Sequence, residues 1–119
     1  MQDLHAVQST AFEIVDIARE MRAEDTYARD GHTARTLVRE ADLRIVLMVM
    51  KAGSMMKEHR VAETASVHTL AGHVRLRLPD GVADLPSGRL LVLERGLQHN
   101  VEALEESTLL LTLGWRAKS

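Results

Sequence analysis

The side chains that could do chemistry in this chain are histidines and carboxylates, because its 119 residues include six His and no Cys. The lack of Cys excludes disulfides, thiolate catalysis and Cys-ligated zinc. Two histidines stand in a regular glycine pattern: His59 follows Gly53 after five residues, and His99 follows Gly88 and Gly96. Imidazole is the commonest metal ligand in proteins, and its nitrogens also orient polar ligands. The pattern therefore selects His59 and His99 as candidate site residues.

Composition predicts one globular domain and excludes several partner classes. Hydrophobic residues make up 45% and charged residues 27%, which is ordinary for a folded chain. A net charge of -2, without a basic run, gives no electrostatic footprint for nucleic acid. The longest apolar run, residues 45–50, is too short to cross a bilayer, and the N-terminus lacks a signal-peptide pattern. We expect a cytoplasmic protein with neither nucleic acid nor membrane as partner.

The N-terminal third contains one helical pattern. Thr10 and Glu13 form a Thr-x-x-Glu capping box, and apolar residues then recur at helical spacing. The spacing predicts one amphipathic helix over residues 10–23, which packs on the rest of the fold or on a second subunit because it is short. A polar segment, residues 23–31, follows. We divide the chain into a helix and linker, residues 1–32, and a β domain, residues 33–119.

The remaining sequence predicts an all-β domain. Short runs rich in Val, Leu, Thr and Ile are separated by Gly, Pro and Asp at hairpin-like intervals. The predicted strands cover residues 33–39, 42–51, 65–70, 73–78, 82–85, 89–93, 99–104 and 108–113. Turns are predicted at Leu78-Pro79-Asp80-Gly81 and at Pro86-Ser87-Gly88. About eight short strands of this kind suit a jelly-roll barrel.

The glycine and histidine pattern resembles the first signature motif of the cupin superfamily, a group of small β-barrels. That motif reads G-x5-H-x-H-x3-4-E-x6-G. Gly53, His59 and Gly72 match it, whereas Val61 and Ala65 stand where the second His and the Glu would be. The resemblance begins near residue 42, and the segment after Gly72 alternates apolar and polar residues as a strand would.

The second cupin motif reads G-x5-P-x-G-x2-H-x3-N. Gly88, Gly96 and His99 match it, with Glu94 and Ala103 in the Pro and Asn positions. The resemblance extends to about residue 113 and implies an all-β, cupin-type jelly-roll β-barrel with one short N-terminal amphipathic α-helix. Cupins include enzymes of several classes, sugar-binding domains and storage proteins, so the fold leaves open whether this chain is an enzyme.

The resemblance also implies a metal site that is half lost. A complete cupin site offers three His and one carboxylate to a divalent metal such as Zn, Ni, Fe or Mn. Here His59 and His99 match the first and last His, while Val61 and Ala65 cannot ligate. Glu63 is the candidate for a third ligand, and its alternative is a solvated loop carboxylate. His59 and His99 either bind a metal or serve as hydrogen-bonding groups inside a metal-free barrel.

The other histidines are assigned away from the site. Strand alternation places His68 on the barrel exterior. His73 follows the Gly72 turn and has no counterpart among cupin ligands. His5 and His32 lie in polar terminal and loop sequence and are predicted to be exposed.

The expected function is the binding of a small molecule inside the barrel. His59, Val61, Ala65, Val67 and His99 are the predicted ligand-binding residues, and this lining favours an apolar or aromatic molecule. A metal-dependent cupin enzyme is the alternative, with His59 and His99, and with Glu63 as a third ligand. Residues 43–50 are apolar on both alternating faces, so both faces should be covered, by the core and by the helix, the second sheet or a subunit interface. The resemblance favours a homodimer.

Overall fold

The structure of the protein is a computed structural model that describes residues 9–59 and 62–114. Two helices precede the strands, with bounds α1 (Ile14–Arg22) and α2 (Asp25–Asp30). The strands are β1 (His32–Arg39), β2 (Leu43–Met50), β3 (Met55–His59), β4 (Ala65–Ala71), β5 (His73–Leu78), β6 (Gly81–Pro86), β7 (Leu90–Leu93), β8 (His99–Ala103) and β9 (Ser107–Gly114). Strands dominate the described part of the chain, as predicted.

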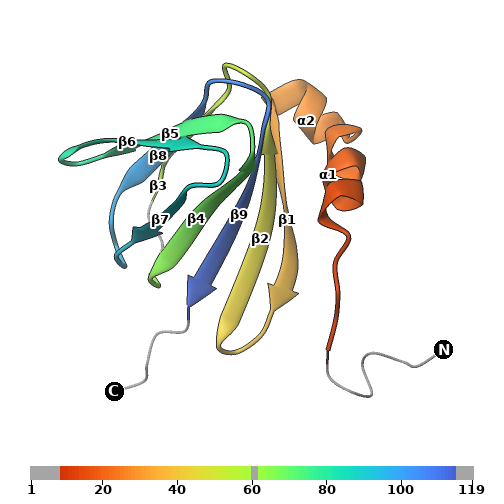
Figure 1. Ribbon diagram of the computed structural model, residues 1–119, viewed down its shortest axis with the longest axis horizontal. Coiled ribbons are helices and arrows are strands. Elements are labelled where there is room, and N and C mark those ends of the chain that lie inside the picture. Colours follow the sequence, from red (N-terminus) through yellow and green to blue (C-terminus); the bar gives the residue numbers. More distant parts are fainter. Residues whose placement is uncertain (1–8, 60–61, 115–119) are drawn as a thin grey trace.

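The strands form two antiparallel sheets that face each other (Figure 1). The larger sheet has the order β1-β2-β9-β4-β7, and the smaller one has the order β3-β8-β5-β6. Between them lies a core to which both sheets contribute one face. Its buried members are Met48, Met50, Val67, Val74, Leu76, Leu85, Leu93, Val101, Ala103 and Leu109.

Strand β2 shows how alternation builds two cores from one apolar run. Met48 and Met50 point into the core between the sheets, whereas Leu47 and Val49 point outward. The outward pair packs under α1, where Met21 is fully buried against it. The two-sided apolarity of this segment is therefore explained by the core on one face and by the helix on the other. Figure 1 shows α1 and α2 beside the outer face of the larger sheet.

The helical region differs from the prediction. Helix α1 begins at Ile14, and Glu13 occupies the N-cap position without a side-chain hydrogen bond, so the predicted capping box with Thr10 does not form. The predicted start at residue 10 was wrong because burial of Met21 on the sheet, rather than the local cap signal, fixes this short helix. Residues 25–30, predicted as a polar linker, form α2.

Helix α2 is held by one aromatic side chain. Tyr27 is buried, its hydroxyl donates a hydrogen bond to Glu106 Oε2 over 3.1 Å, and the Lys51 Nζ lies 5.4 Å from the ring centroid. The helix ends at Gly31, whose φ of 84° is the left-handed conformation of a helix C-cap. A six-residue helix with one apolar anchor has too short a pattern to be recognised in the sequence.

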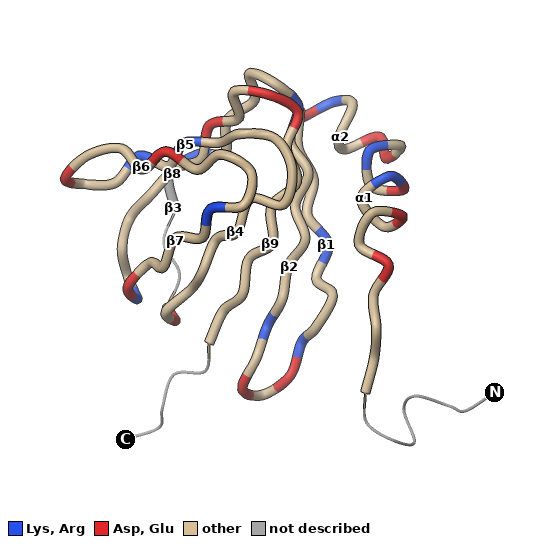
Figure 2. The backbone as a smooth tube through the Cα atoms, viewed as in Figure 1, with Lys and Arg blue, Asp and Glu red and all other residues tan. Residues whose placement is uncertain are grey.

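All eight predicted strands are present, with ends that agree or are shifted by one residue, and one further strand was missed. Strand β3 reads Met-Met-Lys-Glu-His and has neither strict alternation nor β-branched residues. It exists because it pairs with β8, where Met56 is opposite Val101. Pairing with a distant partner overrides weak local propensity. The strands β9, β4 and β7 contain no Lys, Arg, Asp or Glu, so the half of the larger sheet that they form is tan in Figure 2.

Gly72 lies where the chain passes from the larger sheet to the smaller one. Its φ is 89°, and a Cβ placed there would lie 2.3 Å from the Glu106 carbonyl oxygen and 2.7 Å from the Ser107 Cα. Gly88 has a similar φ of 91° but nothing within 4 Å of such a Cβ. Both glycines have the left-handed conformation, but only Gly72 has neighbouring backbone atoms in the way of a side chain. Substituting each one therefore separates the cost of the backbone conformation from the cost of a steric clash.

We predict that Gly72→Ala lowers the free energy of unfolding by about 3–4 kcal/mol, because left-handed strain is added to a clash with backbone atoms. Gly88→Ala is the matched control and should cost about 1 kcal/mol from strain alone. Urea denaturation followed by circular dichroism measures both. Equal losses for the two variants would show that the crossing at Gly72 is not tightly packed.

Candidate ligand site between the sheets

The two histidines selected from the sequence occupy paired backbone positions. The Cα atoms of His59 on β3 and His99 on β8 are register partners, although forty positions separate them in the chain. Residues directly opposite in antiparallel strands have Cα atoms about 4.5–5.5 Å apart. The register shifts between Met56 and His59, which marks an irregularity at this end of β3. The fold thus brings the two cupin-like histidine positions next to each other.

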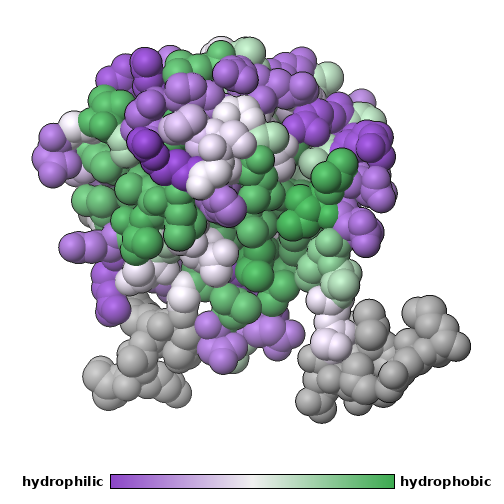
Figure 3. Space-filling model, in the orientation of Figure 1, coloured by the Kyte–Doolittle hydropathy of each residue, from purple (hydrophilic) through white to green (hydrophobic). Residues whose placement is uncertain are grey.

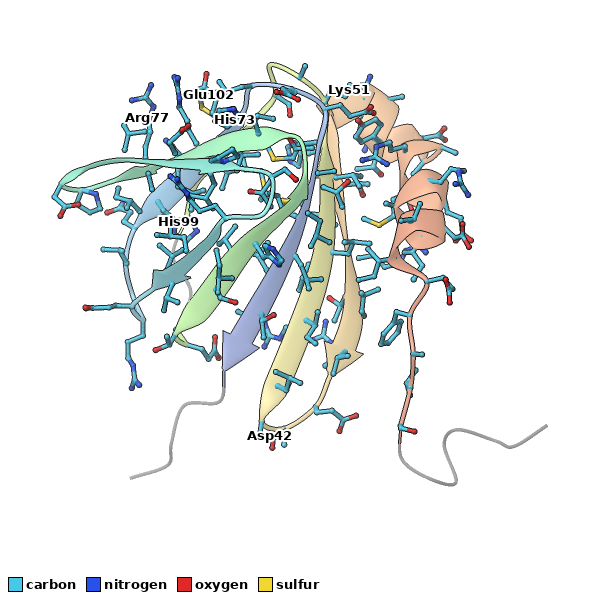
Figure 4. All side chains as sticks on the ribbon, viewed as in Figure 1. Asp42, Lys51, His73, Arg77, His99 and Glu102 are labelled. Carbon is cyan, nitrogen blue, oxygen red and sulfur yellow. The ribbon has the colours of Figure 1, made fainter. Side chains whose placement is uncertain are left out.

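The His99 ring is buried on the inner face of the smaller sheet. It is 3% exposed, and Figure 4 labels it on β8. Val101 and Ala103, the next alternate residues of β8, are buried on the same face. Its Nδ1 lies 3.0 Å from the Leu97 carbonyl oxygen. Because a carbonyl can only accept, Nδ1 carries the hydrogen, and in the neutral ring Nε2 holds the lone pair. In this tautomer Nε2 is the nitrogen that binds a metal or accepts a hydrogen bond.

The predicted lining residues on β4 face the same core. Ala65 and Val67 are buried, and Val67 belongs to the core cluster between the sheets. Ala65 is opposite Leu93 on one side and Leu113 on the other. Val61, the remaining predicted lining residue, lies outside the described residues.

Glu63 lies in the turn before β4. It is half-buried and lines a small hollow of about 40 Å³ together with Glu40 and Arg44, at the end of the larger sheet where β1 turns into β2. Among the side chains that the structure describes, no group of three or more His, Asp or Glu could hold a metal ion. A role for Glu63 as a ligand stays a prediction.

His68 and His73 lie outside the core. His68 lies on the outer face of β4, opposite Leu90 and Leu110, as alternation predicts. His73 Nε2 donates a hydrogen bond to Asp84 Oδ1 over 2.6 Å on the outer face of the smaller sheet, where Figure 4 labels it. This hydrogen bond holds the pKa of the Asp84 carboxyl below its usual value. Strand pairing thus gives His73 a structural role in the β5–β6 hairpin.

The expectation that His32 is exposed was wrong. His32 begins β1 and is half-buried, and its Nδ1 is buried without a hydrogen-bond partner in the described part of the chain. The polar residues around it concealed the strand that starts there. His5 lies outside the described residues.

Sequence reasoning missed two groups around the site. The Leu97 carbonyl, which fixes the His99 tautomer, is a backbone group. Every residue has such a group, so the sequence cannot identify this one. Met56 of β3 packs on the core and is opposite Val101. Recognising β3 as a strand would have been the signal, because Met56 then falls on the inward face.

Comparison with known proteins supports the fold alone. No protein-family model and no curated protein matches the sequence. The chain is similar to a cupin superfamily protein from Desulfitobacterium hafniense, with 15% identity and a TM-score of 0.68 over 71% of this chain and 78% of that one. A conserved protein of unknown function from Streptococcus pyogenes gives 23% identity and a TM-score of 0.68 over 81% and 89% of the two chains.

A larger protein covers more of this chain. A variant of salicylate 1,2-dioxygenase from Pseudoaminobacter salicylatoxidans aligns with 96% of it at a TM-score of 0.76 and 16% identity, using 39% of its own length. This chain therefore has the cupin fold. No helix in the described residues is long and apolar enough to span a membrane.

Proposed function

We propose that this protein binds a small apolar or aromatic molecule between its two sheets, with the His99 ring as the polar contact. The observation that carries the proposal is a buried imidazole beside buried hydrophobic residues of both sheets. Val67, Val101 and Ala103 are buried hydrophobic residues of the two facing sheets. Such a lining with a few polar groups is typical of small-molecule sites.

The chemistry of His99 narrows the ligand class. With Nδ1 bound to the Leu97 carbonyl, the neutral ring accepts a hydrogen bond at Nε2. A ligand that donates one hydrogen from a phenolic hydroxyl while burying a ring satisfies both features. The similar fold named for salicylate, an aromatic acid, supports this class as an analogy.

We predict that phenol or salicylate, each of which carries a phenolic hydroxyl, stabilises the protein against thermal unfolding, by about 2.7 kcal/mol when the ligand is at 100 times its dissociation constant. His99→Leu should weaken binding about ten-fold or more, because it removes the polar contact and keeps a similar volume. His68→Leu is the matched control, since it replaces a histidine on the outer face and should leave binding unchanged. Calorimetric titration measures the affinities.

Two results would contradict the proposal. One is the absence of stabilisation by phenol and by salicylate in the folded parent protein. The other is equal weakening by His99→Leu and His68→Leu, which would mean that the effect of His99 is indirect.

A metal-dependent cupin enzyme is the second candidate, because the backbone positions of His59 and His99 are directly opposite. In this proposal the two imidazoles, with Glu63 as a third ligand, hold a divalent metal such as Zn, Ni, Fe or Mn. A bound divalent metal would activate water, dioxygen or a carbonyl group. The tautomer with the hydrogen on Nδ1 is the one in which a histidine binds a metal through Nε2.

For the metal, we predict about one equivalent of Zn²⁺ or Ni²⁺ in untagged protein dialysed against the ion and analysed by elemental mass spectrometry. His59→Ala should abolish metal binding, and Glu63→Gln should lower the affinity for the metal at least ten-fold. His73→Ala is the control and should leave metal binding unchanged. Parent protein that retains less than a tenth of an equivalent would rule this candidate out.

We also propose that the protein is a homodimer. Two apolar side chains of the edge strand β7, Leu90 and Val92, are 57% and 63% exposed on the outer face of the larger sheet. Figure 3 shows hydrophobic surface gathered on this side of the molecule. No charged residue occurs in β4 or β7, so two copies meeting there would not repel each other.

Size-exclusion chromatography with light scattering should therefore give about twice the chain mass of 13.3 kDa. The double variant Leu90→Ser, Val92→Ser should give a monomer, because it removes the apolar contact without touching the core. Val82→Ser, an exposed apolar residue of β6, is the control. A monomeric parent protein at 0.1 mM would contradict the proposal.

A further inference from the structure

A second hollow lies outside the space between the sheets. Helix α1 packs over β1 and β2, and its other side overhangs β4 and β9 of the same sheet. The hollow under this overhang has a volume of about 240 Å³. It exists because small side chains lie on both walls, with Ala18 on the helix and Ala71 at the end of β4. We refer to it as the helix groove.

The walls of the helix groove are apolar. Ile14 and Val15 from α1 face Leu70 from β4, and Val15 is 72% exposed at the rim. At about 30 Å³ per water molecule in the liquid, the groove has room for about eight water molecules. A hydrocarbon chain of about that many carbons would fill it.

One end of the groove carries a cation. The Arg22 Nη2 donates a hydrogen bond to the Thr108 Oγ1 over 2.6 Å, and both residues line the hollow. The guanidinium has five N–H donors. Arg22 also forms a side-chain hydrogen bond with Tyr27, and its Nε is buried without a hydrogen-bond partner of suitable geometry.

The carboxylate beside Arg22 leaves part of this cation available. Glu106 Oε2 lies 3.1 Å from the Arg22 Nε, but it also accepts a hydrogen bond from the Tyr27 hydroxyl, and the Glu106 side chain is 61% exposed. Because this carboxylate is exposed and also bonded to a tyrosine, it offsets the positive charge of the Arg22 guanidinium only weakly. The Arg22 side chain is 28% exposed, so a carboxylate entering from the groove can reach it.

We infer that the helix groove binds a monocarboxylate with a short hydrocarbon tail. The tail lies between Val15 and Leu70, and the carboxylate accepts hydrogen bonds from the Arg22 guanidinium. Arginine suits this role because its planar fork matches the two oxygens of a carboxylate. The site is separate from the proposed ligand site between the sheets, and either site can exist without the other.

Octanoate is the probe that tests this inference, and 1-octanol is its uncharged counterpart. In ¹H–¹⁵N correlation spectra of the full chain, octanoate should shift the amide signals of Leu70, Ala71 and Thr108. Arg22→Met keeps the length and apolar stem of the side chain, and should weaken octanoate binding about ten-fold while leaving 1-octanol unchanged. Ala71→Leu should fill the groove and weaken both probes at least ten-fold. Ala52→Leu, in an exposed turn, is the matched control.

Three outcomes would overturn the inference. The first is equal affinity for octanoate and 1-octanol in the parent protein. The second is a set of shifts confined to Val67, His99 and Val101, which places the probe between the sheets and leaves the other proposal intact. The third is a change of oligomeric state in Ala71→Leu, which would mean that a second copy of the chain covers the groove.

Discussion

The close passage of three chain segments at Gly72 is the constraint on which the two-sheet arrangement depends. The chain crosses from the larger sheet to the smaller one after β4, at residues 71–73. The crossings that return to the larger sheet after β6 and after β8 begin beside this segment and are hydrogen-bonded to residues 69–73. Gly88 N donates to the Thr69 carbonyl, Ser87 N to the Gly72 carbonyl, and Leu104 N to the His73 carbonyl. The Ser107 Oγ accepts a hydrogen bond from the His73 N. A side chain at position 72 would separate these crossings, so the facing of the two sheets requires glycine there.

The strands could be predicted from the sequence because alternation and turn residues carry the information locally. Residues 73–78 and 81–86 illustrate this, since an alternating run, a Pro-Asp-Gly turn and a second run form the β5–β6 hairpin. Strand β3 and helix α2 could not be predicted, because each depends on a distant partner: β3 on β8, and Tyr27 of α2 on Glu106 of the turn before β9. The start of α1 was misjudged for the same reason. Local signals at Thr10 were present, but packing on Leu47 and Val49 determines where the helix lies.

The site was predictable to the extent that it depends on backbone pattern. The spacing of glycines and histidines identified positions 59 and 99, and the antiparallel pairing of β3 with β8 brings them together. The tautomer of His99 could not be predicted from the sequence, because the backbone oxygen of Leu97 determines it. The helix groove was equally hidden, since it arises from two small residues and one arginine that come from α1 and β4 only after folding.

The central position of β2 has a consequence for the order in which the protein is made. Its neighbours in the sheet are β1, which leaves the ribosome just before it, and β9, which is the last strand among the described residues. Until β9 emerges, one edge of an apolar strand stands open, and such edges template pairing with other chains. The helices that precede it can shield only the side bearing Leu47 and Val49. Nascent chains stalled before residue 107 should therefore be the species most in need of a chaperone.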